Sequence, residues 1–428
     1  MAEMFTEAEW EAIRDELNRD PLKFGLPTRQ YGSVLIASFN IRKLGKLGAK
    51  GRDEPTMRFL ADVCRRFDLV AVQEVMTDMT ALRRLRDLMG ERYGLAVSDV
   101  VGTFPGERGN EERLAFIYNP ALVRRAELVT SVSTSRTKVM KTIARHHKEL
   151  FEEMETNATA KAQRKYYHED LPAYERKVAA GEKPKAPKEP KFDVDVDPFL
   201  QFIREPFAVA FEVHGHPGLG SYDFLAINAH LQFGRMQDRK AEAKAMFEWI
   251  INKVQSEDAT NIVILGDLNF DLDKPEQDLK EIITEFKKIR MRGKNKTMYV
   301  SFPFIFPHPQ PTPLHPDGTV YRTNIRLNQT YDQIGVFSRD EQVGKYLETT
   351  WTGHGENTRW GQPTFPDYGV FNFSDLFSVA IKGKPLNDLA RAEKSAFTKR
   401  FEHKVSDHMP IWYRVPLPLP KESFPTDV

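Results

Sequence analysis

Four apolar runs of the chain each lead into a polar side chain of the kind that binds metal ions or phosphate. The runs are residues 34–39 before Asn40, 69–73 before Glu74, 225–229 before His230, and 262–266 before Asp267 and Asn269. Proteins that alternate strands and helices place their sites where strands end, so we expect these side chains to meet. Each residue alone is more typical of a turn, a surface charge or a satisfied core histidine, and only the whole set, taken with two further segments, indicates a site.

Two further segments complete a set suited to phosphodiester hydrolysis, residues 331–334 (Tyr-Asp-Gln-Ile) and 406–410 (Ser-Asp-His-Met-Pro). That reaction needs neutralised charge on the phosphoryl oxygens, a water nucleophile and a proton for the leaving oxygen. His230 and His408 are the natural proton carriers, and which is acid and which is base stays open. Oxygen ligands suit Mg²⁺, or Mn²⁺ in its place, and one or two ions are both compatible with them. The residues that would supply these ligands are Asn40, Glu74 and Asp407.

Six motifs resemble those of the endonuclease/exonuclease/phosphatase superfamily, in the same order. They are Phe-Asn-Ile at 39–41, Val-Gln-Glu-Val at 72–75, His-Leu at 230–231, Gly-Asp-Leu-Asn at 266–269, Tyr-Asp-Gln-Ile at 331–334 and Ser-Asp-His-Met-Pro at 406–410. The chain is similar to the deoxyribonuclease I branch in three further elements. These are Asn40-Ile41-Arg42 with Gly45, the segment Glu111–Phe116, and Arg204-Glu205-Pro206. The likeness covers about residues 31–130 and 200–415.

The resemblance implies a fold and two histidine–carboxylate pairs. The fold is α/β, a four-layer sandwich with two central mixed β-sheets flanked by helices. Glu112 would orient His230, and Asp332 would orient His408. Such a partner fixes the tautomer of the imidazole and raises its basicity.

The resemblance also implies roles for three residues that face the scissile phosphate. Asp267 would align the attacking water, and Asn269 would donate to a phosphoryl oxygen. Arg204 would either bind a substrate phosphate or pair with Glu205 or another surface carboxylate.

The substrate is less well defined than the reaction. Deoxyribonuclease I uses an arginine and a tyrosine in the DNA minor groove, and Met76 and Asn110 stand at those two positions here. We expect an intracellular DNA endonuclease, with nucleic acid as its partner. The alternatives are a phosphatase or phosphodiesterase of the same superfamily acting on inositol phosphates or phospholipids, and a non-catalytic binding module. The complete set of site residues argues against the last.

The composition narrows the class of protein. The chain has 428 residues, 40% of them hydrophobic, and a net charge of +1, so any basic surface must be local. It has no run of 18 apolar residues and no signal-peptide pattern, so we expect a cytoplasmic protein without a membrane partner. Cys64 is the only cysteine, and its helical, apolar surroundings predict a buried structural thiol.

Apolar runs and helical patterns alternate over residues 31–130 and 193–418, which predicts one α/β domain. In an N-terminal appendage over 1–30, Thr6 and Glu9 lie at capping-box spacing and predict a helix over 6–18. The region of about 340–395 is rich in Gly, Pro, Trp and Phe, and it is expected to form long loops.

Residues 131–192 interrupt the alternation. They hold 14 Lys and Arg against 9 Asp and Glu and end in a Lys/Pro-rich stretch at 181–188. This pattern predicts an inserted basic helical arm followed by an extended linker. The arm would be a solvated extension, a nucleic-acid contact or a protein-binding element. Its basic residues at helical spacing are Lys138, Lys141, Arg145 and Lys148.

Overall fold

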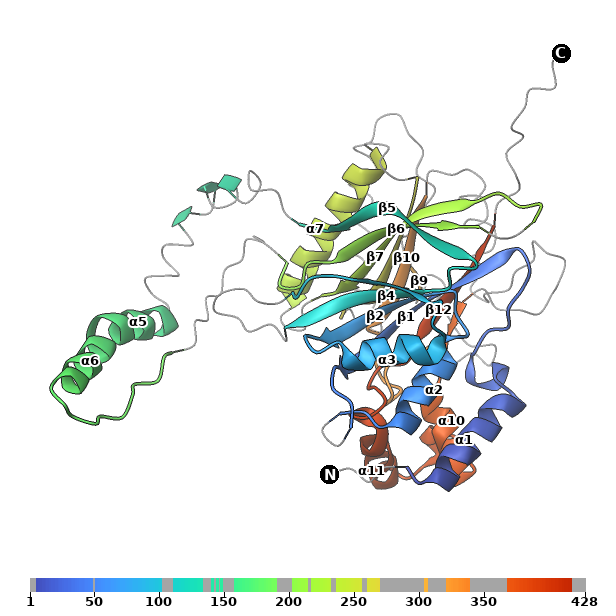
Figure 1. Cartoon of the computed structure of the whole chain (residues 1–428), viewed down its shortest axis with the longest axis horizontal. Coiled ribbons are helices and arrows are strands. Elements are labelled where there is room, and N and C mark those ends of the chain that lie inside the picture. The colour runs from blue at the N-terminus through green and yellow to red at the C-terminus, as the bar shows by residue number, and fades with distance from the viewer. Residues whose placement is uncertain are drawn as a thin grey trace, which may run out of the picture.

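Two six-stranded β-sheets form the body of the protein (Figure 1). The structure is a computed structural model that describes residues 5–48, 51–101, 111–133, 140–141, 144–145, 147–148, 158–190, 202–214, 217–231, 236–255, 260–269, 304–306, 321–338 and 368–417. The first sheet has the order β11 (Tyr368–Val370), β12 (Ile411–Pro416), β1 (Ser33–Leu44), β2 (Leu69–Met76), β4 (Glu112–Tyr118), β3 (Gly94–Val97). The second has the order β5 (Val123–Ser131), β6 (Phe207–Val213), β7 (Tyr222–His230), β8 (Asn261–Asp267), β10 (Asp332–Ser338), β9 (Phe304–Phe306).

Both sheets are mixed. β1 pairs with β2 in parallel, and β7 pairs with β8 in parallel, whereas the other pairings are antiparallel. The seven residues of β8 and the first nine of β1 are all buried. Such continuous burial explains why these strands are unbroken apolar runs, because both faces of each sheet are covered.

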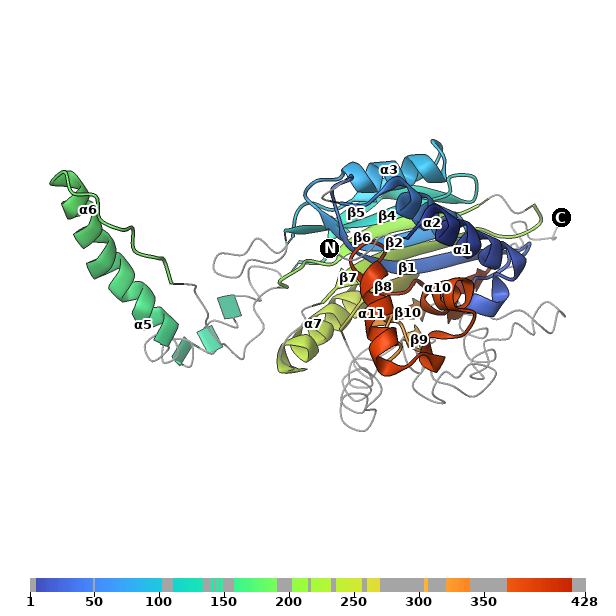
Figure 2. The same ribbon diagram turned by 90° about the horizontal axis from the view of Figure 1, so that it is seen from below.

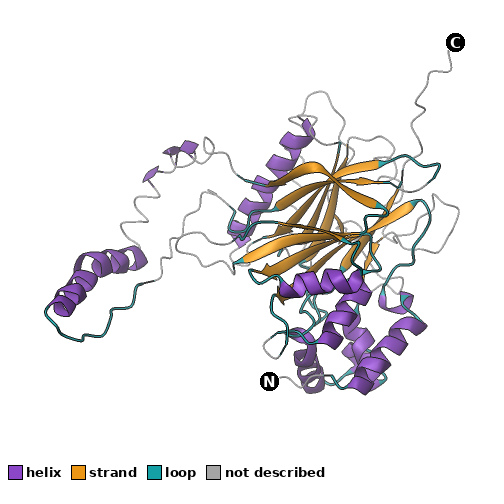
Figure 3. Ribbon diagram, in the orientation of Figure 1, coloured by secondary structure: helices purple, strands orange, loops and turns teal. Residues whose placement is uncertain are grey.

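Helices cover the outer faces of the two sheets (Figures 2 and 3). Outside the first sheet lie α1 (Glu7–Arg19), α2 (Glu54–Cys64), α3 (Thr80–Met89), α10 (Phe373–Lys382) and α11 (Arg391–Glu402), with the short turns η1 (Leu22–Phe24) and η4 (Leu386–Asp388). Outside the second sheet lies α7 (Met236–Gln255), whose Met246 and Phe247 belong to the same buried cluster as Ile264 and Phe337. Between the sheets, Phe116 of β4 contacts Phe211 of β6 edge-on. The predicted four-layer α/β sandwich is confirmed.

Helix α1 begins with the predicted capping box. The Glu9 backbone donates to Thr6 Oγ1 at 3.2 Å, and the Thr6 backbone donates to the Glu9 carboxylate at 2.8 Å. The same carboxylate accepts hydrogen bonds from both terminal nitrogens of Arg400 on α11, at 2.8 and 2.9 Å. Trp10 and Leu17 are buried in the same core as the first sheet. The helix is therefore part of the domain's packing, and not a separate unit.

The expectation of long loops over about 340–395 is wrong for residues 368–395. These residues form β11, α10, η4 and the start of α11. The phenylalanines that suggested irregular structure are the buried face of α10, which includes Phe373 and Phe377. Asn372 caps the start of this helix, and Gly383, with φ of 72°, ends it. Residues 339–367 lie outside the described residues.

Among the described residues of the basic arm, 158–179 form a continuous helical run that lies apart from the sheets (Figures 1 and 2). The run consists of α5 (Ala158–Lys165), the π-helical turn η2 (Tyr166–Asp170) and α6 (Leu171–Ala179). The Lys/Pro-rich stretch then returns along it, because Gln163 donates to the Pro190 carbonyl at 3.2 Å and the Tyr167 hydroxyl bonds to Glu189. Over the described ranges, no helix has both the length and the apolar character needed to cross a bilayer.

Candidate active site

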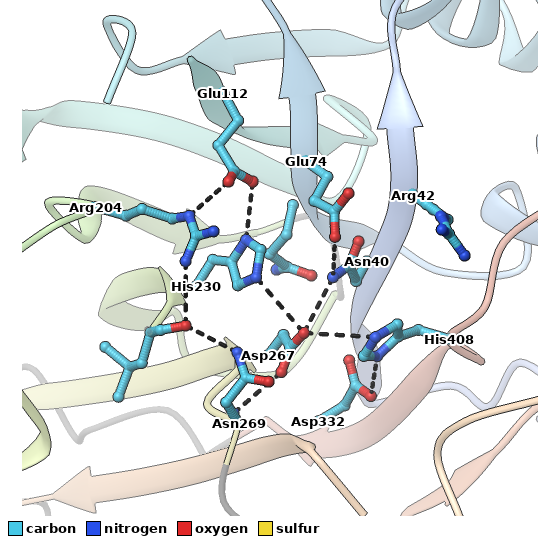
Figure 4. A network of polar contacts seen from close by, with 12 residues as sticks. Asn40, Arg42, Glu74, Glu112, Arg204, His230, Asp267, Asn269, Asp332 and His408 are labelled. Carbon is cyan, nitrogen blue, oxygen red and sulfur yellow. Dashed lines mark hydrogen bonds and ion pairs between the residues drawn. The ribbon is translucent and has the colours of Figure 1, made fainter. Parts of the chain in front are cut away.

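The two parallel strand pairs end at the same place, and this is where the predicted side chains meet (Figure 4). In the first sheet, Asn40 of β1 lies beside Gln73 of β2, directly before Glu74. In the second sheet, His230 of β7 pairs with Asp267 of β8. Because parallel strands end on the same side, each sheet contributes two polar endings, and the face-to-face packing brings the four together. The sequence-based expectation of one shared site is met.

Two backbone irregularities aim carboxylates into this site. Glu74 has a φ of 57° and lies in a bulge, where the register between β2 and β4 shifts between Val72 and Val75. Gly266 has a φ of 147° and approaches the Ala229 backbone so closely that a Cβ would lie 1.8 Å from the Ala229 oxygen. Only glycine fits there, so the glycine of Gly-Asp-Leu-Asn sets the close approach of β7 and β8.

Replacing Gly266 with alanine is expected to destabilise the fold by about 3 kcal/mol or more, because the clash adds to the strained φ. Gly383→Ala is the matched control. Gly383 also has a positive φ, of 72°, but a Cβ there would meet nothing within 4 Å. Urea denaturation of both variants separates the two effects. Equal losses of unfolding free energy would contradict the assignment of the clash at Gly266.

Each site histidine is held by a buried carboxylate. His230 Nδ1 lies 2.8 Å from Glu112 Oε2, and His408 Nδ1 lies 2.8 Å from Asp332 Oδ2. Glu112 and Asp332 are both fully buried. With Nδ1 bound to a carboxylate, each ring carries its proton on that nitrogen and presents Nε2 to the site. The two pairs implied by the resemblance are thus formed in the structure.

Both Nε2 atoms face the same oxygen of Asp267. Asp267 Oδ2 lies 3.7 Å from His230 Nε2, 3.5 Å from His408 Nε2 and 3.1 Å from Asn40 Nδ2. The other oxygen, Oδ1, accepts from the Asn269 backbone at 3.0 Å, which fixes the orientation of the carboxylate. One carboxylate oxygen between two imidazoles can orient a water molecule while either ring takes or gives a proton.

Burial and neighbouring charges shift the pKa values of both site histidines and of Glu112. Burial alone would lower the pKa of His230, but the charge of Glu112 outweighs it and the pKa is raised. Burial alone would raise the pKa of Glu112, but His230 and Arg204 hold it at about 2. Burial opposes protonation of His408 too, yet Asp332 and Asp267 raise its pKa well above the usual value. Both imidazoles therefore hold a proton to higher pH than a free histidine.

Glu112→Gln is expected to move one limb of the pH profile of kcat/KM to lower pH. Without the carboxylate, the pKa of His230 falls. A histidine base must be unprotonated, so a lower pKa extends activity to lower pH. A histidine acid must be protonated, so a lower pKa ends activity at lower pH. The limb that moves identifies the role of His230. Glu212→Gln, which removes an ion pair between Glu212 of β6 and Arg124 of β5, is the control, and equal profiles for both variants would contradict this account.

Solved structures resemble the chain, although no protein-family model and no curated protein sequence matches it. The catalytic domain of human Nocturnin with bound sulfate is 11% identical with a TM-score of 0.41, over 91% of this chain and 96% of that one. An endonuclease/exonuclease/phosphatase family protein and a mannosyl-6-phosphatase, both from Bacteroides thetaiotaomicron, are each 12% identical to the chain. Their TM-scores are 0.38 and 0.37, over 90% of this chain and 98% and 100% of theirs. Endonuclease/exonuclease/phosphatase proteins are thus among the structures that resemble the chain.

Asn40, Glu74 and Asp407 fit a hard cation. The buried oxygens Asn40 Oδ1 and Asp407 Oδ1 accept no hydrogen bond within the described part of the chain. Burial raises the pKa of Asp407, and the charge of Glu74 adds to this rise, whereas His408 and Arg42 oppose it. Within those ranges no group of three or more His, Cys, Asp or Glu is arranged to hold a metal, so the set is two carboxylates and an amide. Mg²⁺ is commonly held by one or two carboxylates, with water and substrate phosphate completing its shell.

Arg204 and Asn269 are both bound to the protein itself. Arg204 Nε donates to the Glu112 carboxylate, and Nη1 donates to the Leu231 carbonyl at 3.3 Å. Asn269 Nδ2 donates to the same carbonyl at 2.8 Å. Of the two roles expected for Arg204, pairing with a carboxylate is present, but its partner is a buried site residue and not Glu205. Arg204 thereby stabilises the ionised form of Glu112.

A buried arginine that the sequence analysis did not identify supports the site. Arg52 is 4% exposed and donates to the carbonyls of Arg42, Lys43 and Val405. It ties the end of β1, where Lys43 has a φ of 47°, to the segment that carries Asp407. Burial lowers the pKa of Arg52 to about 10, while Glu74 and Asp407 oppose the shift. No local pattern marks this residue, because its partners are main-chain carbonyls distant in sequence.

Proposed function

We propose that the protein is a metal-dependent phosphodiesterase that cleaves nucleic acid, most simply a DNA endonuclease. The observation that carries the proposal is the convergence of both histidine Nε2 atoms on Asp267 Oδ2, within 3.7 Å, with a buried carboxylate behind each ring. Two proton carriers on either side of one orienting carboxylate suit in-line displacement, where the attacking and leaving oxygens lie on opposite sides of phosphorus.

The residues would divide the reaction between them. Asp267 and one histidine orient the water, whose oxygen bonds to phosphorus as its proton passes to that histidine. The bond from phosphorus to the leaving oxygen breaks, and the other histidine gives this oxygen its proton. Asn269 would donate to a phosphoryl oxygen, for which its amide must leave the Leu231 carbonyl. A divalent cation, Mg²⁺ or Mn²⁺, held by Asn40, Glu74 and Asp407 would supply neutralisation of the phosphoryl charge.

Arg204 offers a further phosphate contact. Its Nη2 has no hydrogen-bond partner among the described side chains and main chain, whereas its other two nitrogens are bound. A guanidinium that is already fixed by Glu112 would bind a phosphate oxygen with little loss of side-chain freedom.

The substrate panel is the experiment that tests the proposal. The protein and a His230→Ala variant are incubated with supercoiled plasmid, linear duplex, RNA and a phosphoinositide, each with Mg²⁺, Mn²⁺ or EDTA. We expect metal-dependent DNA cleavage that the variant lacks. Cleavage of the phosphoinositide alone would favour the second candidate, a phosphatase or phosphodiesterase for inositol phosphates or phospholipids. No hydrolysis of any substrate would favour a non-catalytic binding module.

The arm is proposed as the nucleic-acid contact that replaces the minor-groove residues missing at Met76 and Asn110. Lys141, Arg145 and Lys148 lie in helical turns and are exposed, whereas Lys138 lies outside the described residues. Deleting residues 136–192 is expected to weaken DNA binding and reduce its salt dependence, because fewer counterions are released. Binding titrations at several salt concentrations measure both. Unchanged affinity and slope would exclude this role and leave a protein partner or a solvated extension.

The proposed place of action is the cytoplasm, because a single cysteine allows no intramolecular disulfide and so fits a reducing compartment. Cys64, the only cysteine, is fully buried, and burial raises the pKa of its thiol to about 12. The predicted structural thiol is confirmed, and such a group is unreactive.

A further inference from the structure

Three buried side chains bridge the two sheets one layer away from the candidate active site. Ser38, Gln73 and Asn228 are each fully buried. Asn228 lies on β7, two residues before His230, and Ser38 lies on β1, two residues before Asn40. Because side chains alternate along a strand, these residues lie on the same strand faces as the site residues that follow them.

Every polar group of the Asn228 side chain forms hydrogen bonds with the opposite sheet. Its Nδ2 donates to the Val72 carbonyl at 3.1 Å and to the Ala115 carbonyl at 2.9 Å. Its Oδ1 accepts from Gln73 Nε2 at 2.7 Å, and Gln73 bonds in turn to Ser38. Val72 and Ala115 are the last regular pair of β2 and β4 before the bulge. Asn228 is therefore hydrogen-bonded to β2 at the point where the regular pairing of β2 with β4 stops.

The bulge has a direct consequence for Glu74. Gln73 and Glu74 both lie opposite the single residue Leu114, and the parallel register between β1 and β2 shifts at the same point. In a regular strand, successive side chains point to opposite faces. Here Gln73 reaches Asn228, while Glu74 reaches Asn40 Nδ2 at 3.1 Å. Because of the bulge, two successive side chains both point into the space between the sheets.

This backbone conformation needs support. Glu74 adopts a φ of 57°, which costs free energy for any residue other than glycine and persists only where the surroundings hold it. We propose that Asn228, acting with Gln73, is a positioning residue that holds the β2 bulge and so places the Glu74 carboxylate for the metal ion. The inference deepens the proposed function and rests on it through the assignment of Glu74 as a metal ligand.

The test compares two buried asparagines. Asn228→Leu removes the bridge, and Asn261→Leu removes a like amide–carbonyl bond of 2.9 Å to Asp223 at the far end of β8. The cation probe is Mn²⁺ alone, followed by electron paramagnetic resonance. We expect Asn228→Leu to raise the half-saturating Mn²⁺ concentration about 10- to 100-fold, the usual cost of losing a residue that orients a ligand. Asn261→Leu should leave it unchanged, although both variants lose stability.

A second measurement does not depend on the metal. Hydrogen exchange of the peptide covering residues 69–76, without added cation, should be faster in Asn228→Leu than in Asn261→Leu, because the bulge opens more often. If Asn228→Leu does not fold, Gln73→Met takes its place. It removes the bonds of Gln73 to Asn228 and to Ser38 and leaves the two backbone contacts of Asn228, so a smaller shift in the same direction is expected.

The outcomes separate this inference from the proposed function. Saturable Mn²⁺ binding by the wild type, with equal half-saturation in Asn228→Leu or Gln73→Met and in the control, would overturn the inference alone. Unchanged exchange over residues 69–76 would do the same. A wild-type protein without saturable Mn²⁺ binding would overturn the metal assignment of the proposed function and, with it, the placement of Glu74 for a cation.

Discussion

Replacing Asp267 with asparagine is expected to lower kcat by about 10³-fold without unfolding the protein. Asp267 Oδ2 is the one atom that both histidines and Asn40 share, so the change removes the acceptor that orients the water. It also removes a charge that helps to raise the pKa of His230 and His408. Steady-state kinetics at saturating Mn²⁺, with circular dichroism to check folding, measure the effect.

The matched control for Asp267→Asn is Asp68→Asn. Asp68 is also buried, and it accepts from the Leu35 backbone at 2.9 Å and from Arg29. It directly precedes β2, at the end of that strand opposite Glu74. We expect its loss to reduce stability and leave kcat unchanged at a temperature where the variant is folded. An Asp267→Asn enzyme with near wild-type kcat would remove Asp267 from the reaction.

Removal of either site histidine is expected to lower kcat by about 10²- to 10⁴-fold. Because one ring takes a proton and the other gives one in the same displacement, the two losses should not add. The His230→Ala/His408→Ala double variant should be little slower than the worse single variant. Single-turnover rates of the three variants measure this coupling.

His403→Ala is the control for the histidine variants. His403 follows α11 five residues before His408, and it is exposed. Its removal should leave the single-turnover rate at the wild-type value. Fully additive losses in the double variant would contradict a shared proton-transfer step and would point to two independent contributions.

The site was predictable from sequence where it depends on strand ends. Asn40, Glu74, His230 and Asp267 each follow an apolar run, and two parallel pairs in facing sheets bring such endings together. The pairing of each histidine with its carboxylate needed the family resemblance. Glu112 lies 118 residues before His230 in the chain, and no local spacing indicates such a partner.

The parts that escaped prediction are those set by tertiary packing. Asn228 belongs to an apolar strand, and only the opposing sheet reveals that its amide is satisfied by main-chain carbonyls. Arg52 donates to the main-chain carbonyls of residues 42, 43 and 405, and no side-chain pattern in the sequence indicates such partners. The aromatic residues of α10 suggested loops, since composition alone does not show that Phe373 and Phe377 share a buried helical face.

The most direct test of the central claim is the rate at which supercoiled plasmid DNA is hydrolysed as a function of Mn²⁺ concentration, because its leaving group is a sugar oxygen that needs a proton. Wild type, His230→Ala and His403→Ala are compared, with EDTA as the zero point. We predict saturable, metal-dependent hydrolysis in wild type and His403→Ala, and a rate about 10²- to 10⁴-fold lower in His230→Ala at every Mn²⁺ concentration. Hydrolysis that persists in EDTA, or that is equal in His230→Ala and wild type, would contradict the claim.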